Sequence, residues 1–229
     1  MSASTGHRVC SQPGLLALAS LVALYMAGTA WAGGEGDFDY WTMASFLIPI
    51  NEDWRFRFDQ RVTFTDEARR LDHQQQGYGV IYSGLADWLD LGVGVKLHAN
   101  KKGDDWDRET RPLLNVTVKS TLFGCSVSNR SRIAYRDFED DDDVWRFRHK
   151  ITVRSPVTFT PLEIRPYVAE EIFVQFDDED VNGNRVYGGF YVPLHEQIRL
   201  ELFYAWHLSE EEDSWHDTNI LASYLRFTF

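Results

Sequence analysis

Cysteine is scarce in this sequence, and long apolar runs are missing from most of it. The chain has two cysteines, Cys10 and Cys125, in 229 residues. If Cys10 is removed with an N-terminal signal, one chain can form no internal disulfide. This excludes the class of small secreted domains that are held together by disulfides. After residue 33, no stretch has the roughly twenty apolar residues that a transmembrane helix needs.

The N-terminus carries the one long apolar run of the chain, residues 14–28. Arg8 precedes this run, and a small-x-small motif follows it at residues 30–32. A basic start, a short apolar run and a small-residue cleavage motif are typical of a secretory signal peptide. We therefore expect residues 1–32 to be a cleaved signal peptide and residues 33–229 to form one domain.

The rest of the sequence alternates between apolar and polar residues in short segments. In the clearest one, Trp54, Phe56 and Phe58 share one parity and arginines occupy the other. Side chains alternate across a β-strand, so this spacing puts the two sets on opposite faces. The predicted strands cover residues 38–48, 53–65, 73–84, 89–99, 109–120, 122–136, 144–155, 162–176, 184–194, 197–208 and 216–229.

These segments predict an all-β fold, a single antiparallel transmembrane β-barrel of roughly 10–12 strands. The last segment ends in Phe229, with Leu225 and Phe227 on the same parity. Such an ending resembles the C-terminal strand that the barrel-insertion machinery reads in bacterial outer-membrane proteins. Because bacterial barrels have even strand numbers, eleven segments leave the role of residues 33–48 open. The alternative is a soluble β protein with tryptophans in its core.

Acidic residues gather between the predicted strands and account for the formal net charge of −12. Long acidic links are expected near 65–73, 100–107, 137–143, 177–183 and 209–215, and short links between them. In outer-membrane barrels, long links face outside and short turns face the periplasm. We expect the acidic links to be solvated external loops; a further hypothesis is that they bind lipopolysaccharide through divalent cations. No exposed basic patch is evident, which argues against nucleic acid as a partner.

Several stretches resemble the domain of unknown function 2490 family, an uncharacterised group of bacterial outer-membrane β-barrels. They are SNRSRIAYRDF (128–138), VWRFRHKITV (144–153), RPYVAEEIF (165–173), NRVYGGFYVPL (184–194) and the closing strand. The resemblance implies a barrel fold and an outer-membrane location in a Gram-negative bacterium. It brings no activity, cofactor or ligand to transfer.

Two local features of the predicted strands need an explanation. Glu170 and Glu171 are adjacent, so we expect one of them to break the alternation at a bulge. Gly188 and Gly189 are expected to relieve crowding inside a curved sheet.

Basic residues dominate the face opposite the apolar one, which we expect to line the lumen. The predicted lumen residues are Arg55, Arg57, Arg61, Arg111, Arg130, Arg132, Arg136, Arg146, Arg148, Arg154, Arg185, Arg199, Glu171 and Glu201. One hypothesis is a small, wet, anion-biased channel, because guanidinium groups match carboxylate and phosphate. The alternative is a purely structural closed barrel, in which these arginines pair with acids, tyrosines and water.

A third hypothesis is a membrane-embedded lipid hydrolase. Asn129, Ser131 and His149 fall on the apolar parity, and a hairpin centred on Asp140 would put Ser131 opposite His149. A serine beside a histidine base is the arrangement of an activated nucleophile. No histidine or cysteine spacing typical of a metal site occurs, and no cofactor is expected.

Overall fold

The described part of the chain consists of β-strands joined by turns. The computed structural model describes residues 38–229 except 67, 140, 177–180 and 212–213. The strands are β1 (Phe38–Pro49), β2 (Trp54–Thr65), β3 (Arg70–Ala86), β4 (Leu89–Lys102), β5 (Asp105–Leu122), β6 (Cys125–Phe138), β7 (Val144–Arg154), β8 (Arg165–Gln175), β9 (Val181–His195), β10 (Ile198–Glu211) and β11 (Ser214–Thr228). The predicted all-β fold is confirmed, and the predicted signal peptide, residues 1–32, lies outside the described residues. Among the described residues there is no helix long and apolar enough to cross a membrane.

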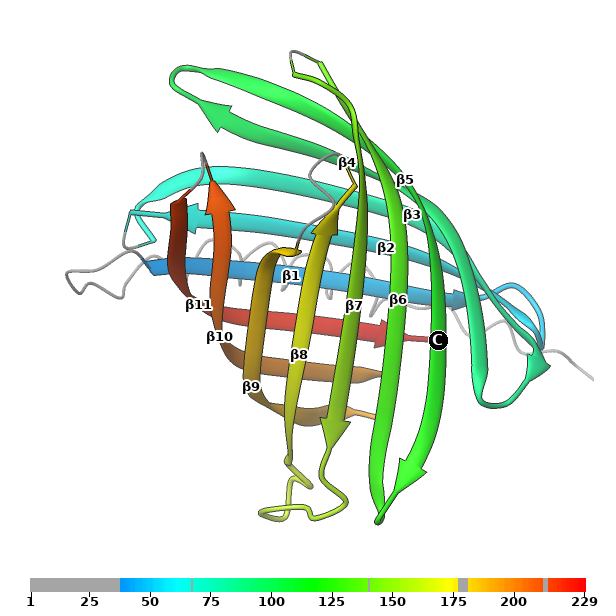
Figure 1. Ribbon diagram of the computed structural model, residues 1–229. Helices are drawn as coiled ribbons and strands as arrows, with labels where there is room; N and C mark the ends of the chain where they lie inside the picture. Colours follow the sequence, from blue (N-terminus) through cyan, green and yellow to red (C-terminus); the bar gives the residue numbers. More distant parts are fainter. Residues whose placement is uncertain (1–37, 67, 140, 177–180, 212–213) are drawn as a thin grey trace, which may run out of the picture. The chain divides into compact units, whose positions relative to one another are not determined.

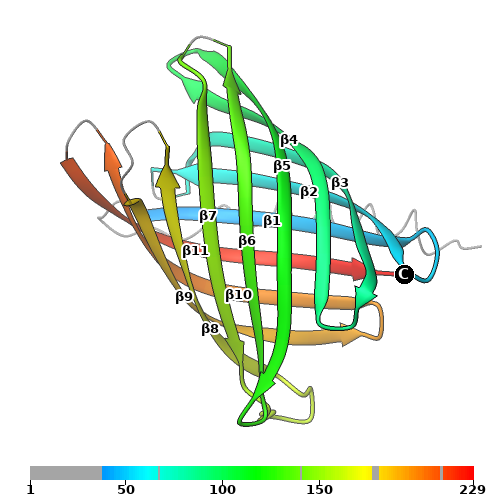
Figure 2. The same ribbon diagram turned by 45° about the vertical axis from the view of Figure 1, so that its right-hand side comes forward.

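Strands that are neighbours in sequence pair antiparallel, and the sheet closes as a barrel (Figure 1, Figure 2). Closure joins β1 to β11, with Phe38 opposite Asn219 and Leu47 opposite Thr228. This seam is parallel, because the first and last of eleven described strands in a meander run in the same direction. The predicted number of strands, roughly 10–12, is confirmed by the eleven described strands. The parallel seam removes the need for an even number, which holds only when every pair is antiparallel.

The two faces of the barrel wall differ in chemistry. Most arginines of the strands and the buried tyrosines Tyr167, Tyr187, Tyr191 and Tyr224 point inward, and apolar side chains alternate with them on the outside. Val93, Leu114 and Val168 on the outer face are 51%, 56% and 59% exposed. Charges that point into the interior of a barrel leave bulk water, so they must be paired or hydrated. The outer surface is therefore the apolar one, the reverse of a soluble barrel.

The links between strands differ in length from the predicted pattern. At the end of the barrel that holds the acidic links, hereafter the acidic end, β4 and β5 continue to Lys102 and Asp105, which pair and leave a two-residue turn. At the other end, where Phe229 lies and which we call the C-terminal end, the link 155–164 is longer. The predicted contrast between long and short links is therefore wrong. Acidic residues extend the strands, because backbone pairing tolerates polar side chains on both solvated faces.

The alternation of β8 is unbroken, so the bulge expected at the paired glutamates is wrong. Glu171 is buried inside, whereas Glu170 is exposed outside. The irregularity falls between Phe173 and Val174, where the pairing with β9 shifts. Adjacent residues of a strand point to opposite faces, so two adjacent acids need no change of phase.

Two adjacent glycines on β9 offer a matched test of packing inside the barrel. A Cβ on Gly189 would lie 2.5 Å from the backbone oxygen of Leu202 and 2.6 Å from the Cβ of Phe203. One on Gly188 would meet nothing within 4 Å. The expected relief of crowding is thus confirmed for Gly189 and wrong for Gly188.

We expect Gly189→Ala to lower the free energy of unfolding by about 1–3 kcal/mol, because overpacking strains its neighbours. Gly188→Ala should leave the free energy of unfolding unchanged or raise it, since it only restricts the unfolded chain. Urea unfolding of the detergent-solubilised protein measures both values. Equal losses in the two variants would contradict the close approach at Gly189.

Candidate functional site: the basic lumen

The interior of the barrel has an aromatic wall and a basic wall. The aromatic wall, on β1 and β8–β10, consists of Trp41, Tyr167, Tyr187, Tyr191 and Phe203. Where the walls meet, cations lie over rings, with Lys150 Nζ 3.5 Å from the centroid of Tyr187. The sequence did not reveal this wall, because inward tyrosines that alternate with outward apolar residues give little polar contrast.

Glu171 on β8 is the centre of one buried charge network. Arg148 donates to its Oε1 from Nε at 3.1 Å and from Nη2 at 2.9 Å, and Arg130 donates to the same oxygen at 3.3 Å. The hydroxyl of Tyr187 donates to Oε2 at 2.7 Å. Both carboxylate oxygens are therefore engaged, and two arginines from β6 and β7 are held in place by a residue that is 1% exposed.

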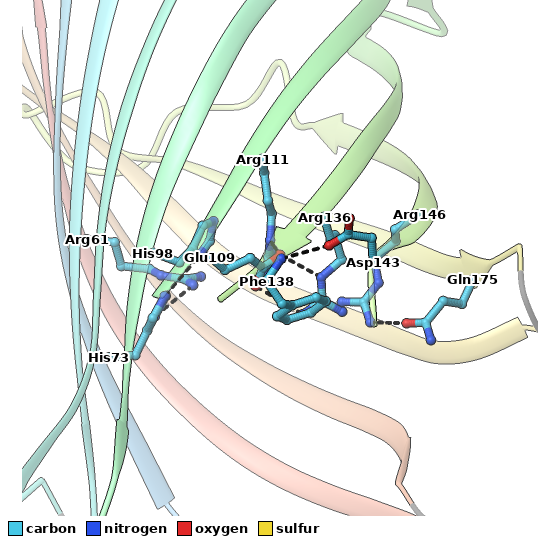
Figure 3. Close-up of polar contacts among 10 residues, drawn as sticks. All are labelled: Arg61, His73, His98, Glu109, Arg111, Arg136, Phe138, Asp143, Arg146 and Gln175. Atoms are coloured by element: carbon cyan, nitrogen blue, oxygen red, sulfur yellow. Dashed lines mark hydrogen bonds and ion pairs between the residues drawn. The ribbon is translucent and has the colours of Figure 1, made fainter. Parts of the chain in front are cut away.

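Glu109 on β5 anchors a second network, nearer the acidic end (Figure 3). Its two oxygens accept hydrogen bonds from Arg111, and Arg136 on β6 donates to them at 2.7 and 3.1 Å. The guanidinium of Arg136 also lies 4.5 Å from the ring centroid of Phe138. Glu109 was missed by the sequence analysis, although it shares the inward parity of Arg111 and that parity was the available signal.

Histidine and amide contacts fill the same end of the lumen (Figure 3). Arg61 Nη2 lies 3.1 Å from Nδ1 of His73, and Nε2 of His73 lies 2.9 Å from Nδ1 of His98. On the other side, Arg146 donates to Oε1 of Gln175 at 2.6 Å. Together with the Glu109 network, these contacts pack the lumen toward the acidic end.

Two further acids order the C-terminal end of the lumen. Glu201 accepts a hydrogen bond from the hydroxyl of Tyr167 at 2.6 Å and one from Nε of Arg226 at 2.9 Å. Asp90, which the sequence analysis did not single out, accepts from Arg55 at 3.3 Å. Asp90 also accepts a hydrogen bond from Lys119 at 3.0 Å, so these two acids hold Arg226, Arg55 and Lys119.

A cavity of about 350 Å³ lies between these networks. Its basic lining residues are Arg55, Arg57, Lys96, Arg130, Arg132, Lys150, Arg154, Arg199 and Arg226, and its acidic ones are Asp59, Asp90 and Glu201. Toward the acidic end, a second gap of about 10 Å³ is lined by Arg111, Arg132, Arg136, Arg146 and Arg148. That gap has room for about one water molecule. The open space therefore lies on the C-terminal side of the packed networks.

The predicted lumen residues fall into three groups in the structure. Those around the larger cavity are Arg55, Arg57, Arg130, Arg132, Arg154, Arg199 and Glu201. Those around the small gap are Arg111, Arg132, Arg136, Arg146 and Arg148. The others, Arg61, Arg185 and Glu171, pack against neighbouring side chains: Arg61 and Arg185 lie over the ring of Trp41, and Glu171 lies under Arg148.

Two cavity arginines have no acidic partner in the described part of the chain. The guanidinium carbons of Arg154 and Arg199 lie 4.8 and 5.0 Å from the ring centroid of Tyr191, so they are within about 10 Å of each other. Tyr167 stacks on the same ring at 4.5 Å. The Nε of each arginine is buried and has no hydrogen-bond partner among the described residues. Because unpaired buried charge is costly, this pair favours a bound anion.

Comparison with known proteins identifies a family for the chain. A family model described as protein of unknown function (DUF2490) matches residues 38–218, from the start of β1 into β11. The chain belongs to this family. The match confirms the resemblance carried by the segments of β6 to β9. No curated protein and no solved structure matches the chain.

The outer face of this DUF2490 protein brings together the serine and histidine singled out in its sequence. Ser131 on β6 pairs with His149 on β7, which confirms the predicted register, and Oγ of Ser131 lies 3.0 Å from Nδ1 of His149. Asn129 lies on the same face, two residues before Ser131. Within the described ranges, no cluster of three histidine, cysteine, aspartate or glutamate residues could hold a metal ion.

Proposed function

We propose that this protein is an outer-membrane β-barrel whose basic lumen takes up small anions. An apolar outer face, a predicted signal peptide at residues 1–32 and a closing strand that ends in Phe229 support the location. In this proposal, acyl chains contact the outward apolar residues and the barrel-insertion machinery reads Phe229. The acidic end then meets lipopolysaccharide, with divalent cations between the carboxylates and the lipid phosphates.

The cavity lining is the observation that carries the anion proposal. Nine basic side chains and three acidic ones face a space of about 350 Å³. The low-dielectric walls of the cavity strengthen the electric field of this excess positive charge. The cavity therefore attracts anions and repels cations. A closed structural barrel explains the arginines that pair with Glu171 and Glu109. It does not explain Arg154 and Arg199, for which the described residues supply no acid.

The chemistry of the lining favours a small organic acid or phosphate. Guanidinium groups present two parallel donors that fit a carboxylate or phosphate, and they remain charged at every physiological pH. Binding pockets for drug-sized ligands usually occupy about 300–1,000 Å³. The cavity is at the small end of that range, which favours a solute with few heavy atoms.

The asymmetry of the lumen suggests a direction of access. The larger cavity includes Arg55, Arg154 and Arg199, which are at or next to the strand termini on the C-terminal end of the barrel. The Glu109 network occupies the acidic end. We infer that an anion enters from the C-terminal end, and that passage through the barrel requires the side chains around Glu109 to move.

The proposal is tested by recording currents from the purified protein in a planar lipid bilayer. Under a salt gradient, we expect the reversal potential to have the sign of anion selectivity. Millimolar phosphate or a small dicarboxylate should reduce the chloride current by occupying the cavity. Cell fractionation should recover the mature protein, cleaved after Ala32, from the outer membrane.

Two results would contradict the proposal. A cation-selective current would show that the arginines do not control the path. A folded barrel that neither conducts nor binds phosphate in calorimetry would favour the closed structural alternative.

A further inference from the structure

We infer that the outer face of the barrel carries an acyl-transfer site for apolar esters, built on Ser131 and His149. The two side chains project from paired positions of β6 and β7, with Oγ of Ser131 3.0 Å from Nδ1 of His149. Both are partly exposed. A serine hydroxyl that donates to a histidine nitrogen is the first requirement of an activated nucleophile.

Glu170 stands where an orienting carboxylate is needed. His149 pairs with Ile172 across β7 and β8, and Glu170 pairs with Ile151, so His149 and Glu170 are diagonal neighbours on the same face. Such neighbours are about 7–8 Å apart, within reach of long side chains. When Ser131 donates to Nδ1, the proton of the neutral imidazole is on Nε2, and no described residue accepts it. The carboxylate of Glu170 can, which would orient His149.

Two asparagines complete the group. Nδ2 of Asn184 on β9 donates to Oε1 of Glu170 at 3.0 Å, which holds the carboxylate on the outer face. Asn129 lies next to Ser131 on that face, and its amide has no hydrogen-bond partner in the described part of the chain. A side-chain amide beside the nucleophile is a suitable donor to the oxyanion that forms during attack on an ester.

The residues around Ser131, His149 and Glu170 argue against an ordinary solvated surface. The neighbouring outward residues Ile151, Val168 and Val186 are 41%, 59% and 46% exposed. Polar and ionisable side chains within an apolar, lipid-facing surface are costly to keep, and they usually mark a functional site. Because Ser131, His149 and Glu170 lie near the middle of their strands, the expected substrate is an uncharged ester dissolved among acyl chains.

The reaction is a two-step hydrolysis. Oγ of Ser131 attacks the carbonyl carbon of the ester while Nδ1 of His149 takes the hydroxyl proton. The tetrahedral oxyanion collapses, the carbon–oxygen bond to the alcohol breaks, and His149 returns the proton to the leaving oxygen. Water then attacks the acyl-serine with His149 as base, which releases the fatty acid and restores Ser131.

The test uses the full-length mature protein in detergent micelles. An alkyl fluorophosphonate probe should label the wild type at Ser131, as shown by peptide mass spectrometry. p-Nitrophenyl laurate should be hydrolysed faster than p-nitrophenyl acetate. Ser131→Ala and His149→Ala should each lower the rate by at least about 10³-fold. Ser126→Ala, a change near the start of the same strand, should keep both labelling and rate.

Two positioning variants separate a catalytic role from a structural one. Asn129→Ala should lower the rate by about 10²–10³-fold while the variant still folds. Glu170→Gln should lower the rate about tenfold or more, and Glu170→Asp should recover part of it, because a carboxylate rather than bulk is required. Folding of each variant is checked by its heat-modifiable migration on gels.

Absence of labelling in folded wild-type protein overturns the inference. So does labelling that persists in Ser131→Ala. If wild type is inactive but Ser131→Ala disrupts a dimer seen by cross-linking, the polar group is a contact between copies and the acyl-transfer site is refuted.

Discussion

Glu171→Gln is expected to lower the free energy of unfolding by about 3–5 kcal/mol. The substitution keeps the volume of the side chain and removes its charge. Arg148 and Arg130 would then be buried without the carboxylate that receives them at 2.9 and 3.3 Å. Breaking one side of a buried ion pair costs more than the pair contributes, because the remaining charge stays desolvated. Urea unfolding in detergent, followed by tryptophan fluorescence, measures the change.

Glu170→Gln is the matched control for that experiment. Glu170 precedes Glu171 on the same strand and is exposed on the outer face, and its one side-chain hydrogen bond among the described residues is with Asn184. An exposed polar pair contributes less than about 1 kcal/mol. We expect stability within that margin of wild type, or higher if the outer face contacts lipid. Equal effects of the two substitutions would show that the Glu171 network does not hold the barrel together.

The double variant Arg154→Glu with Arg199→Glu is expected to convert the lumen from anion to cation selectivity. Each change reverses a charge that faces the cavity and has no described acidic partner. Neither arginine belongs to the Glu171 or Glu109 networks, so the barrel should still fold. Arg148 is a poorer choice, because it supports Glu171 and its loss would damage the structure. The reversal potential of the variant in a planar bilayer should change sign.

Arg108→Glu provides the control for the change in charge. Arg108 is exposed on the outward parity of β5. Reversing it alters the net charge of the protein as one cavity substitution does, but it should leave the reversal potential unchanged. An unchanged potential in the double variant would mean that ions do not pass Arg154 and Arg199.

The strands of this barrel were predictable because one face of the wall differs from the other. Arg55, Arg57 and Arg61 alternate with apolar residues on β2, and a period of two is enough to identify both strand and face. The pairing of Ser131 with His149 followed from a single assumed hairpin. Strand ends were less predictable, because the acidic residues Asp105 and Asp107 look like part of a loop while their backbones continue the ladder.

The contacts inside the lumen could not be read from the sequence. Glu109 binds Arg136, which is 27 positions away in the sequence. Whether these two side chains meet depends on the stagger of β5 against β6. Inward tyrosines such as Tyr187 and Tyr191 carry no parity signal, since outward positions can be aromatic too. Periodicity therefore assigns a face to each residue, whereas partners and open volume depend on how all the strands curve together.

The parallel seam between β1 and β11 puts the first described residue, Phe38, and the last, Phe229, at opposite ends of the barrel. Phe38 starts β1 beside Asn219, near the acidic end, and Pro49 and Thr228 finish their strands at the opposite end. In an even-stranded meander both termini share one side. Here Phe38 and Phe229 lie at opposite ends of the barrel, so in a barrel that spans a bilayer these two residues are on different sides of the membrane.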